Sequence, residues 1–156
     1  MNNARREALK TGGGITLLTL IFASGFLKPG EAISAEWNKA AFDTKNFADT
    51  MKALGGGNPA ESADIVMTAP DIAENGAVVP VSVLSKIPKT ESIAILIEKN
   101  PNMLTATFEI PEGTEPNIGT RVKMGQTSNV FALVKADGKY YTVAKEIKVT
   151  LGGCGG

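Results

Sequence analysis

The chain has a single cysteine, Cys154, which lies between glycines in the segment GGCGG, residues 152–156. The four glycines of this segment are Gly152, Gly153, Gly155 and Gly156. Because glycine lacks a side chain and adopts many backbone conformations, the segment is predicted to be a slim, flexible arm. At about 3.3 Å per extended residue, Cys154 could extend roughly 10 Å beyond Leu151. Such a thiol could enter a channel too narrow for a folded surface, which favours delivery of a thiol-bound group to another protein.

The composition excludes most ways in which this chain could catalyse a reaction alone. Its 156 residues include no histidine, so there is no Ser-His or Cys-His pair and no histidine-based zinc or haem site. One thiol cannot form an internal disulfide, a CxxC redox pair or a four-cysteine metal site. We therefore predict no catalytic residue, no metal and no cofactor, and a thiol at Cys154 on which other proteins act. Basic and acidic side chains number 16 each, which gives no electrostatic reason to propose nucleic acid as a partner.

Residues 1–35 have the pattern of an export signal peptide. A basic start is followed by an apolar run over residues 15–27 and then by small residues, as in a cleaved signal. The run is shorter than the ~20 residues that span a bilayer, so an uncleaved membrane anchor is the weaker interpretation. Arg5 and Arg6 precede the apolar run, as in a twin-arginine signal, although a general secretory signal can also contain two arginines. We predict a periplasmic protein with no membrane attachment after cleavage, which could follow Ala32, Ser34 or Ala35.

After the signal, the pattern predicts one helix over residues 36–57. Apolar residues recur there at three- and four-residue spacing, which is typical of a helix with one packing face: Trp37, Ala40, Ala41, Ala48, Met51 and Leu54. Three glycines, Gly55 to Gly57, supply a C-terminal stop. The apolar face could cover the rest of this chain or a second subunit.

Residues 58–151 are predicted to form an all-β domain. Seven segments rich in β-branched and aromatic residues are separated by turn signals: 63–69, 77–85, 92–98, 103–110, 118–124, 129–136 and 140–151. Asn100-Pro101-Asn102 fits a short hairpin connection, and Asp137-Gly138 fits a two-residue hairpin. Short strands at this spacing favour an immunoglobulin-like antiparallel β-sandwich. Pro80 predicts an edge position or a bulge, because proline cannot donate to a sheet ladder.

Three other interpretations of the C-terminal segment are weaker. It could be a frayed terminus with an accidental thiol, but an exposed cysteine in an oxidising compartment is open to unwanted disulfides and overoxidation. Prenylation requires a cysteine fourth from the end, whereas Cys154 is third from the end. A terminal Gly-Gly is also typical of ubiquitin-like carriers, but these need ATP, which an exported protein would not meet.

The GGCGG segment, behind a β-domain and an export signal, resembles the C-terminus of SoxY, the Y subunit of the bacterial thiosulfate-oxidising Sox system. Residues 74–83, ENGAVVPVSV, are also similar to a strand segment of that family. The resemblance extends from about Trp37 to Gly156.

This resemblance implies a carrier without catalytic activity, in which the residue equivalent to Cys154 holds sulfur intermediates covalently. It implies a heterodimer with a SoxZ-like subunit, itself a small β-sandwich. A haem-containing SoxAX-like partner joins thiosulfate oxidatively to the thiol, and a SoxB-like metal-dependent hydrolase then removes the terminal sulfonate as sulfate. In many members a molybdenum–haem sulfur dehydrogenase oxidises the remaining sulfur further.

Two competing classes of function stay open from the residues alone. An exported sandwich could be a binding or assembly module with an incidental terminal thiol, and the strand around Pro80 could then be its docking site. A self-contained thiol enzyme would need a fixed base beside Cys154, which neither the glycines nor the histidine-free composition supplies.

Overall fold

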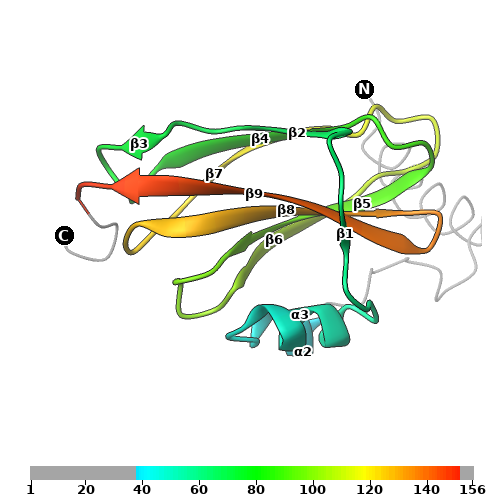
Figure 1. The fold of residues 1–156 in the computed structure, drawn as a ribbon, viewed down its shortest axis with the longest axis horizontal. Helices are drawn as coiled ribbons and strands as arrows, with labels where there is room; N and C mark the ends of the chain where they lie inside the picture. Colours follow the sequence, from blue (N-terminus) through cyan, green and yellow to red (C-terminus); the bar gives the residue numbers. More distant parts are fainter. Residues whose placement is uncertain (1–37, 152–156) are drawn as a thin grey trace, which may run out of the picture. The chain divides into compact units, whose positions relative to one another are not determined.

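Two β-sheets form most of the structure, a computed structural model that describes residues 38–151 (Figure 1). The strands are β1 (Ala60–Glu61), β2 (Ile65–Thr68), β3 (Ile72–Ala73), β4 (Val79–Ser85), β5 (Thr90–Ile97), β6 (Leu104–Glu109), β7 (Asn117–Val122), β8 (Ser128–Ala136) and β9 (Lys139–Val149). The larger sheet has the order β1-β9-β8-β5-β6, with β3 beside β9, and the smaller sheet has the order β2-β4-β7. The predicted all-β sandwich is therefore confirmed.

The hydrophobic core lies between the two sheets and follows from alternation along the strands. In β4, Val79, Val81 and Val83 are buried, whereas Pro80 and Ser82 between them are exposed. The buried valines belong to one apolar cluster with side chains of β5 and β8 from the larger sheet, including Ile93, Ile95, Ile97, Val130 and Val134. Each fully buried side chain of this kind contributes about 1.5–3 kcal/mol to folding, so this cluster holds the two sheets face to face.

The two predicted hairpins are both present. Strands β8 and β9 pair up to Ala136 and Lys139, and the two residues between them, Asp137 and Gly138, have φ of 48° and 72°. Positive φ at both central residues is the requirement of a type I′ turn, whose twist matches that of the strands. Strands β5 and β6 pair antiparallel through a connection that contains Asn100.

All seven predicted strands occur, but two further strands were not predicted. Strands β1 and β3 have two residues each, and both pair parallel with β9. The sandwich was expected to be antiparallel, and these two parallel pairings are the exceptions to that expectation. Two residues are too few to show a period, and their pairing depends on β9, which lies far along the chain.

The predicted edge position is confirmed for Pro80 itself, although the strand that contains it is not an edge strand. Strand β4 is the middle strand of the smaller sheet, between β2 and β7. However, β2 pairs only with the segment from Ser82 to Ser85, while Pro80 pairs with Arg121 of β7. Among the strands of residues 38–151, Pro80 therefore has a partner on one side only, which explains how a proline is tolerated there. Strand β4 as a whole is therefore not the edge strand that was suggested for docking, and among the described residues only its start, around Pro80, has no strand partner on the β2 side.

The prediction of a single helix over residues 36–57 is wrong, because the described part of this segment forms two short helices. These are α2 (Lys39–Phe42) and α3 (Phe47–Ala53). The break is explained by Asn46, whose side-chain oxygen accepts a hydrogen bond from the Asp49 N–H at 2.9 Å. Asparagine at an N-cap stabilises a new helix start more than it stabilises a helix interior. Trp37 lies outside the described residues.

The two helices cover the outer face of the larger sheet (Figure 1). Ala41 and Met51 are buried in a second apolar cluster with Leu96, Leu104 and Leu133 from the sheet. The predicted apolar face therefore packs against this chain. Within residues 38–151, no helix has the length and apolar character that a membrane crossing requires.

Two of the three glycines after α3, Gly55 and Gly56, have a structural reason. The Gly56 N–H donates to the Met51 carbonyl at 2.8 Å and the Gly55 N–H to the Lys52 carbonyl at 3.1 Å, and Gly55 has a φ of 75°. This is a Schellman motif, in which the left-handed residue after the cap is usually glycine. A Cβ on Gly56 would lie 2.7 Å from the Tyr140 ring. The helix end therefore needs glycine at both positions.

Candidate functional site

The residues that the sequence predicts to be functional lie outside the described part of the chain. These are Cys154, the arm glycines Gly152, Gly153, Gly155 and Gly156, and the signal arginines Arg5 and Arg6. The last described residue is Leu151, three positions before the cysteine. What the structure does show is how the backbone is held at the point where the arm, residues 152–156, leaves the fold. We call residues 148–151 the arm root.

The arm root extends beyond the β8–β9 ladder and is held by other segments. The ladder ends where Ser128 pairs with Ile147. Beyond it, the Val149 N–H donates to Thr127 Oγ1 at 2.9 Å. On the other side, the Lys148 N–H donates to the Asp71 carbonyl at 2.9 Å and the Thr150 N–H to the Ala73 carbonyl at 3.1 Å. The backbone of β9 is therefore secured on both sides until just before the arm.

The segment of residues 71–76, which we call the clamp loop, supplies most of these contacts. The Gly76 N–H donates to the Leu151 carbonyl at 2.7 Å, and the Gly76 carbonyl accepts from the Met124 N–H at 2.7 Å. Thr150 Oγ1 also donates to the Glu74 carbonyl at 3.1 Å. Gly76 thereby connects the last described residue to the end of the smaller sheet, and Gly76 itself is buried. The clamp loop fixes the position from which the arm begins.

The clamp loop is in turn held by its own turn and by a lysine. Asn75 Oδ1 accepts from the Ala77 N–H at 2.9 Å, an Asx turn that asparagine favours. Lys145 of β9 donates to the Ala69 carbonyl and lies 2.9 Å from an Asp71 carboxylate oxygen. Because Asp71 is largely exposed, its ion pair with Lys145 is weak, and the backbone hydrogen bonds carry most of the restraint.

The sequence indicates the turn in the clamp loop but not the contacts that the loop makes with the arm root. Residues 74–83, which include the end of the clamp loop, are similar to a strand segment of a known family. Asn75-Gly76 is a strong turn signal, so the turn itself was predictable. Its hydrogen bond to Leu151 was not, since 75 positions of sequence separate the two residues.

The residues with shifted pKa values lie at the other end of β9, near the β8–β9 hairpin. A hydrogen bond from Lys135, together with one from the Gly138 N–H, lowers the pKa of Glu91, and the same contact with Glu91 raises the pKa of Lys135. Burial raises the pKa of Tyr140, whose hydroxyl donates to the Leu54 carbonyl at 2.7 Å. These interactions stabilise the fold and are remote from the arm root.

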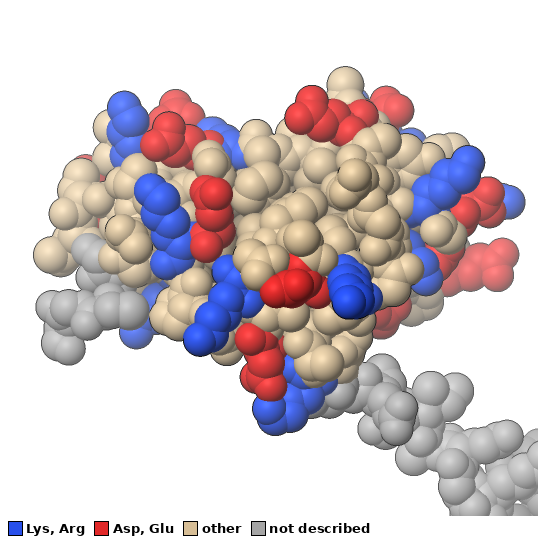
Figure 2. Space-filling model, turned by 60° about the horizontal axis from the view of Figure 1, so that its bottom comes forward, with Lys and Arg blue, Asp and Glu red and all other residues tan. Residues whose placement is uncertain are grey.

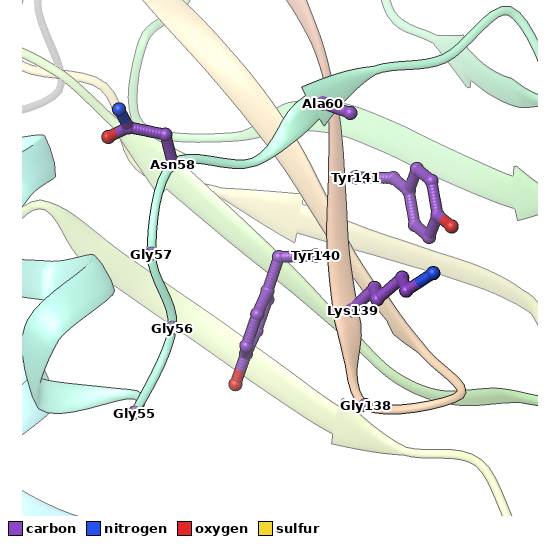
Figure 3. A pocket seen from close by; sticks show the side chains of 9 residues that line it. All are labelled: Gly55, Gly56, Gly57, Asn58, Ala60, Gly138, Lys139, Tyr140 and Tyr141. Carbon is purple, nitrogen blue, oxygen red and sulfur yellow. The ribbon is translucent and has the colours of Figure 1, made fainter.

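A shallow pocket lies beside the same hairpin (Figure 3). Its lining residues are Gly55, Gly56, Gly57, Asn58, Ala60, Gly138, Lys139, Tyr140 and Tyr141. Tyr140 and Leu151 are the two ends of an extended stretch, on the order of 30 Å apart at the rise of a β-strand. Since Cys154 can reach only about 10 Å from Leu151, the thiol of the same chain cannot enter this pocket.

The described residues contain no metal-binding cluster, and the charges on the face that carries the helices are mixed. Residues 38–151 contain no group of three or more histidine, cysteine, aspartate or glutamate side chains placed to bind a metal ion. Figure 2 shows acidic and basic side chains interspersed over the helix-bearing face, without a large field of one sign.

Comparison with known proteins identifies the family. The family profile described as "Sulfur oxidation protein SoxY" matches residues 50–154. The solved structure of the sulfur carrier protein SoxY from Chlorobium limicola f thiosulfatophilum is 38% identical, with a TM-score of 0.60, and the match covers 66% of this chain and 94% of that one.

Two further comparisons add nothing to this assignment. A structure of the superantigen toxic shock syndrome toxin-1 matches at 13% identity with a TM-score of 0.38, over 55% of this chain and 98% of that one, which is too low to support an argument. A search of the curated proteins finds no match. With its profile match and a 38% identical SoxY structure, this chain belongs to the SoxY family of sulfur oxidation proteins.

Proposed function

We propose that this protein is a covalent carrier of sulfur compounds and that Cys154 is the attachment site. The observation that carries the proposal is the match to the SoxY family, which extends to Cys154 as its last residue. The related structure is of a sulfur carrier protein. Cys154 is also the only thiol of the chain, so a carrier of covalently bound sulfur has no other cysteine to use.

The proposed cycle places every catalytic group on a partner. A haem-containing partner forms a bond between Cys154 Sγ and the outer sulfur of thiosulfate, and it takes up two electrons while the thiol proton is released. A metal-dependent hydrolase then adds water across the bond between sulfur and sulfonate, which releases sulfate and leaves a persulfide on Cys154. A sulfur dehydrogenase can oxidise the remaining sulfur before the hydrolase releases it.

The same proposal includes export and a second subunit. Residues 1–35 act as the export signal, with Arg5 and Arg6 as the twin-arginine pair, and the mature protein works in the periplasm. It forms a heterodimer with a SoxZ-like β-sandwich subunit. The β-sandwich of residues 58–151 is the body that partners recognise, and the arm of residues 152–156 presents the thiol.

The experiment is intact-mass spectrometry of the protein purified from its native periplasm, before and after reduction. We expect reducible additions in units of sulfur, or of sulfur plus sulfonate, on the peptide that contains Cys154. The Cys154→Ser variant should carry none of them and keep the melting temperature of the parent. Sulfur loading by the partner enzymes in Cys154→Ser, or an unmodified parent that they cannot load, would show that the protein is not this carrier.

A further inference from the structure

The clamp loop contains the only asparagine of the chain that is followed by glycine, Asn75-Gly76. In such a pair the glycine nitrogen can attack the asparagine side-chain amide, because glycine has no side chain that blocks the approach. The Asn75 side chain is exposed, whereas Gly76 is buried. The pair is therefore a candidate site of spontaneous deamidation, and its contacts decide whether the attack can occur in the folded protein.

The reaction needs water and no other reagent. The Gly76 nitrogen loses its proton to solvent and forms a bond with Cγ of Asn75, and ammonia leaves as the bond between Cγ and Nδ2 breaks. Water then opens the resulting cyclic imide at one of its two carbonyl carbons, and nothing is oxidised or reduced. One opening gives aspartate at position 75. The other gives isoaspartate, in which the main chain runs through the side-chain carbonyl carbon and is longer by one carbon atom.

One contact prepares the Asn75 side chain for this attack. Its Oδ1 accepts a hydrogen bond from the Ala77 N–H at 2.9 Å, and this Asx turn folds the side-chain amide back over the backbone that follows. A hydrogen bond donated to Oδ1 also stabilises the negative charge that develops on this oxygen when Cγ is attacked. The turn thus holds and polarises the group that reacts.

A second contact prevents the attack while the arm root is in place. The Gly76 N–H donates to the Leu151 carbonyl at 2.7 Å, and the Gly76 carbonyl accepts from the Met124 N–H at 2.7 Å. The proton that must leave is therefore held by a carbonyl oxygen, and Gly76 is fixed at both its amide and its carbonyl group. A buried amide of this kind reaches solvent only when the local structure opens.

We propose that Asn75-Gly76 is a latent deamidation site, which reacts only when the Leu151 carbonyl separates from the clamp loop. The rate of deamidation then reports how often the arm root opens. Isoaspartate lengthens the backbone of the clamp loop, so Gly76 cannot keep its bonds to Leu151 and Met124 in the same geometry, and the opening becomes permanent. This inference concerns the clamp loop alone and holds whatever group Cys154 carries.

The test measures deamidation of the mature full-length protein during incubation at mildly alkaline pH in oxygen-labelled water. Peptide mass spectrometry quantifies labelled aspartate and isoaspartate at position 75. The double variant Thr127→Val/Thr150→Val removes two hydroxyl hydrogen bonds at the arm root. The control Thr142→Val removes one hydroxyl hydrogen bond near the other end of β9. The parent unfolded in guanidinium chloride gives the rate of the unprotected pair.

We expect the folded parent to deamidate at position 75 at least about a hundredfold more slowly than the unfolded chain. The double variant should react roughly 30-fold faster than the folded parent, because each lost hydrogen bond makes opening about fivefold more frequent. The control should match the parent. A folded parent that reacts as fast as the unfolded chain, a double variant that matches the parent, or an equal acceleration in Thr142→Val would each overturn the proposal.

Discussion

Removing two hydroxyl groups at the arm root should loosen it without changing the arm itself. In the double variant Thr127→Val/Thr150→Val, the Val149 N–H loses its acceptor, Thr127 Oγ1 at 2.9 Å. The hydrogen bond from Thr150 Oγ1 to the Glu74 carbonyl, at 3.1 Å, is lost as well. Valine has nearly the shape of threonine, so the main effect is the loss of these two bonds.

The expected magnitude follows from the two bonds. A hydrogen bond of this kind contributes about 1 kcal/mol net, and the two bonds have no partner in common. Their loss should therefore favour opening of the arm root by about 2 kcal/mol. Since about 1.4 kcal/mol corresponds to a factor of ten, the open root should become roughly 30-fold more populated.

Amide hydrogen exchange measured by NMR reports this opening directly. The reporters are the N–H groups of Thr150 and Gly76, which donate to Ala73 and Leu151. The control is Thr142→Val, which removes a hydroxyl that donates to the Ala132 carbonyl at 3.1 Å near the other end of β9. The control should leave exchange at both reporters unchanged. If the double variant exchanged like the parent, or if the control accelerated exchange equally, the root would open only with the whole domain and the clamp loop would have no local role.

Three further predictions concern the hairpin end and the arm. Tyr140→Phe should lower the free energy of unfolding by about 1 kcal/mol at pH 7, measured in urea, because the bond to the Leu54 carbonyl is lost. Burial raises the pKa of Tyr140 in the folded state. The parent should therefore lose stability as pH rises above the ordinary tyrosine pKa of 10.0, and the difference in free energy of unfolding between the parent and Tyr140→Phe should shrink there. A difference that stays constant with pH would contradict this prediction. Gly56→Ala should cost about 1–3 kcal/mol in the same assay, because its Cβ would lie 2.7 Å from the Tyr140 ring. Gly153→Trp should slow sulfate release by the hydrolase while iodoacetamide still alkylates Cys154 at the parental rate, and parental enzyme kinetics would refute the need for a slim arm.

The strands could be predicted because their signals are local. Alternation of buried and exposed residues in β4 is visible in the letters VPVSV, and the turn at Asp137-Gly138 needs only two residues that tolerate positive φ. A buried strand face and a tight turn can each be recognised from a few neighbouring residues. These local patterns are sufficient to predict the hairpins of the sandwich, because the register of a hairpin is set by its turn.

Features that depend on distant partners could not be predicted in the same way. The break between α2 and α3 is an example, because Ala41 and Ala48 are seven residues apart, so the apolar face resumes in phase after the polar residues 43–46. The Met103 N–H donates to the Thr44 carbonyl at 2.9 Å within this break, and that contact exists only once the sheet has formed. The N-cap residue Asn46 was a local signal of the break, but the apolar pattern on both sides of it outweighed that signal.

The candidate site divides in the same way between chemistry and position. The thiol is evident from composition, since one cysteine among 156 residues has no partner in its own chain. The clamp loop is held mainly through carbonyl and amide groups of Asp71, Ala73 and Gly76. Every residue has backbone carbonyl and amide groups, so the side chains at these positions do not indicate that the backbone contacts the arm root. The role of Cys154 therefore stays a prediction from composition, and the contacts that hold the arm root could not be predicted from the sequence.

The same division predicts that an exposed side chain of the clamp loop can be changed without loosening the arm root. Ile72 is carried by β3, but its side chain is 57% exposed, while the neighbouring Ala73 is buried and its carbonyl accepts from the Thr150 N–H. Because the backbone holds the root, the side chain of Ile72 is not required for it. Ile72→Glu should therefore leave amide exchange at Thr150 unaltered, whereas Thr127→Val/Thr150→Val should accelerate it. If Ile72→Glu accelerated exchange at this position as much as the loss of both hydroxyls, the root would depend on side-chain packing and not mainly on backbone hydrogen bonds.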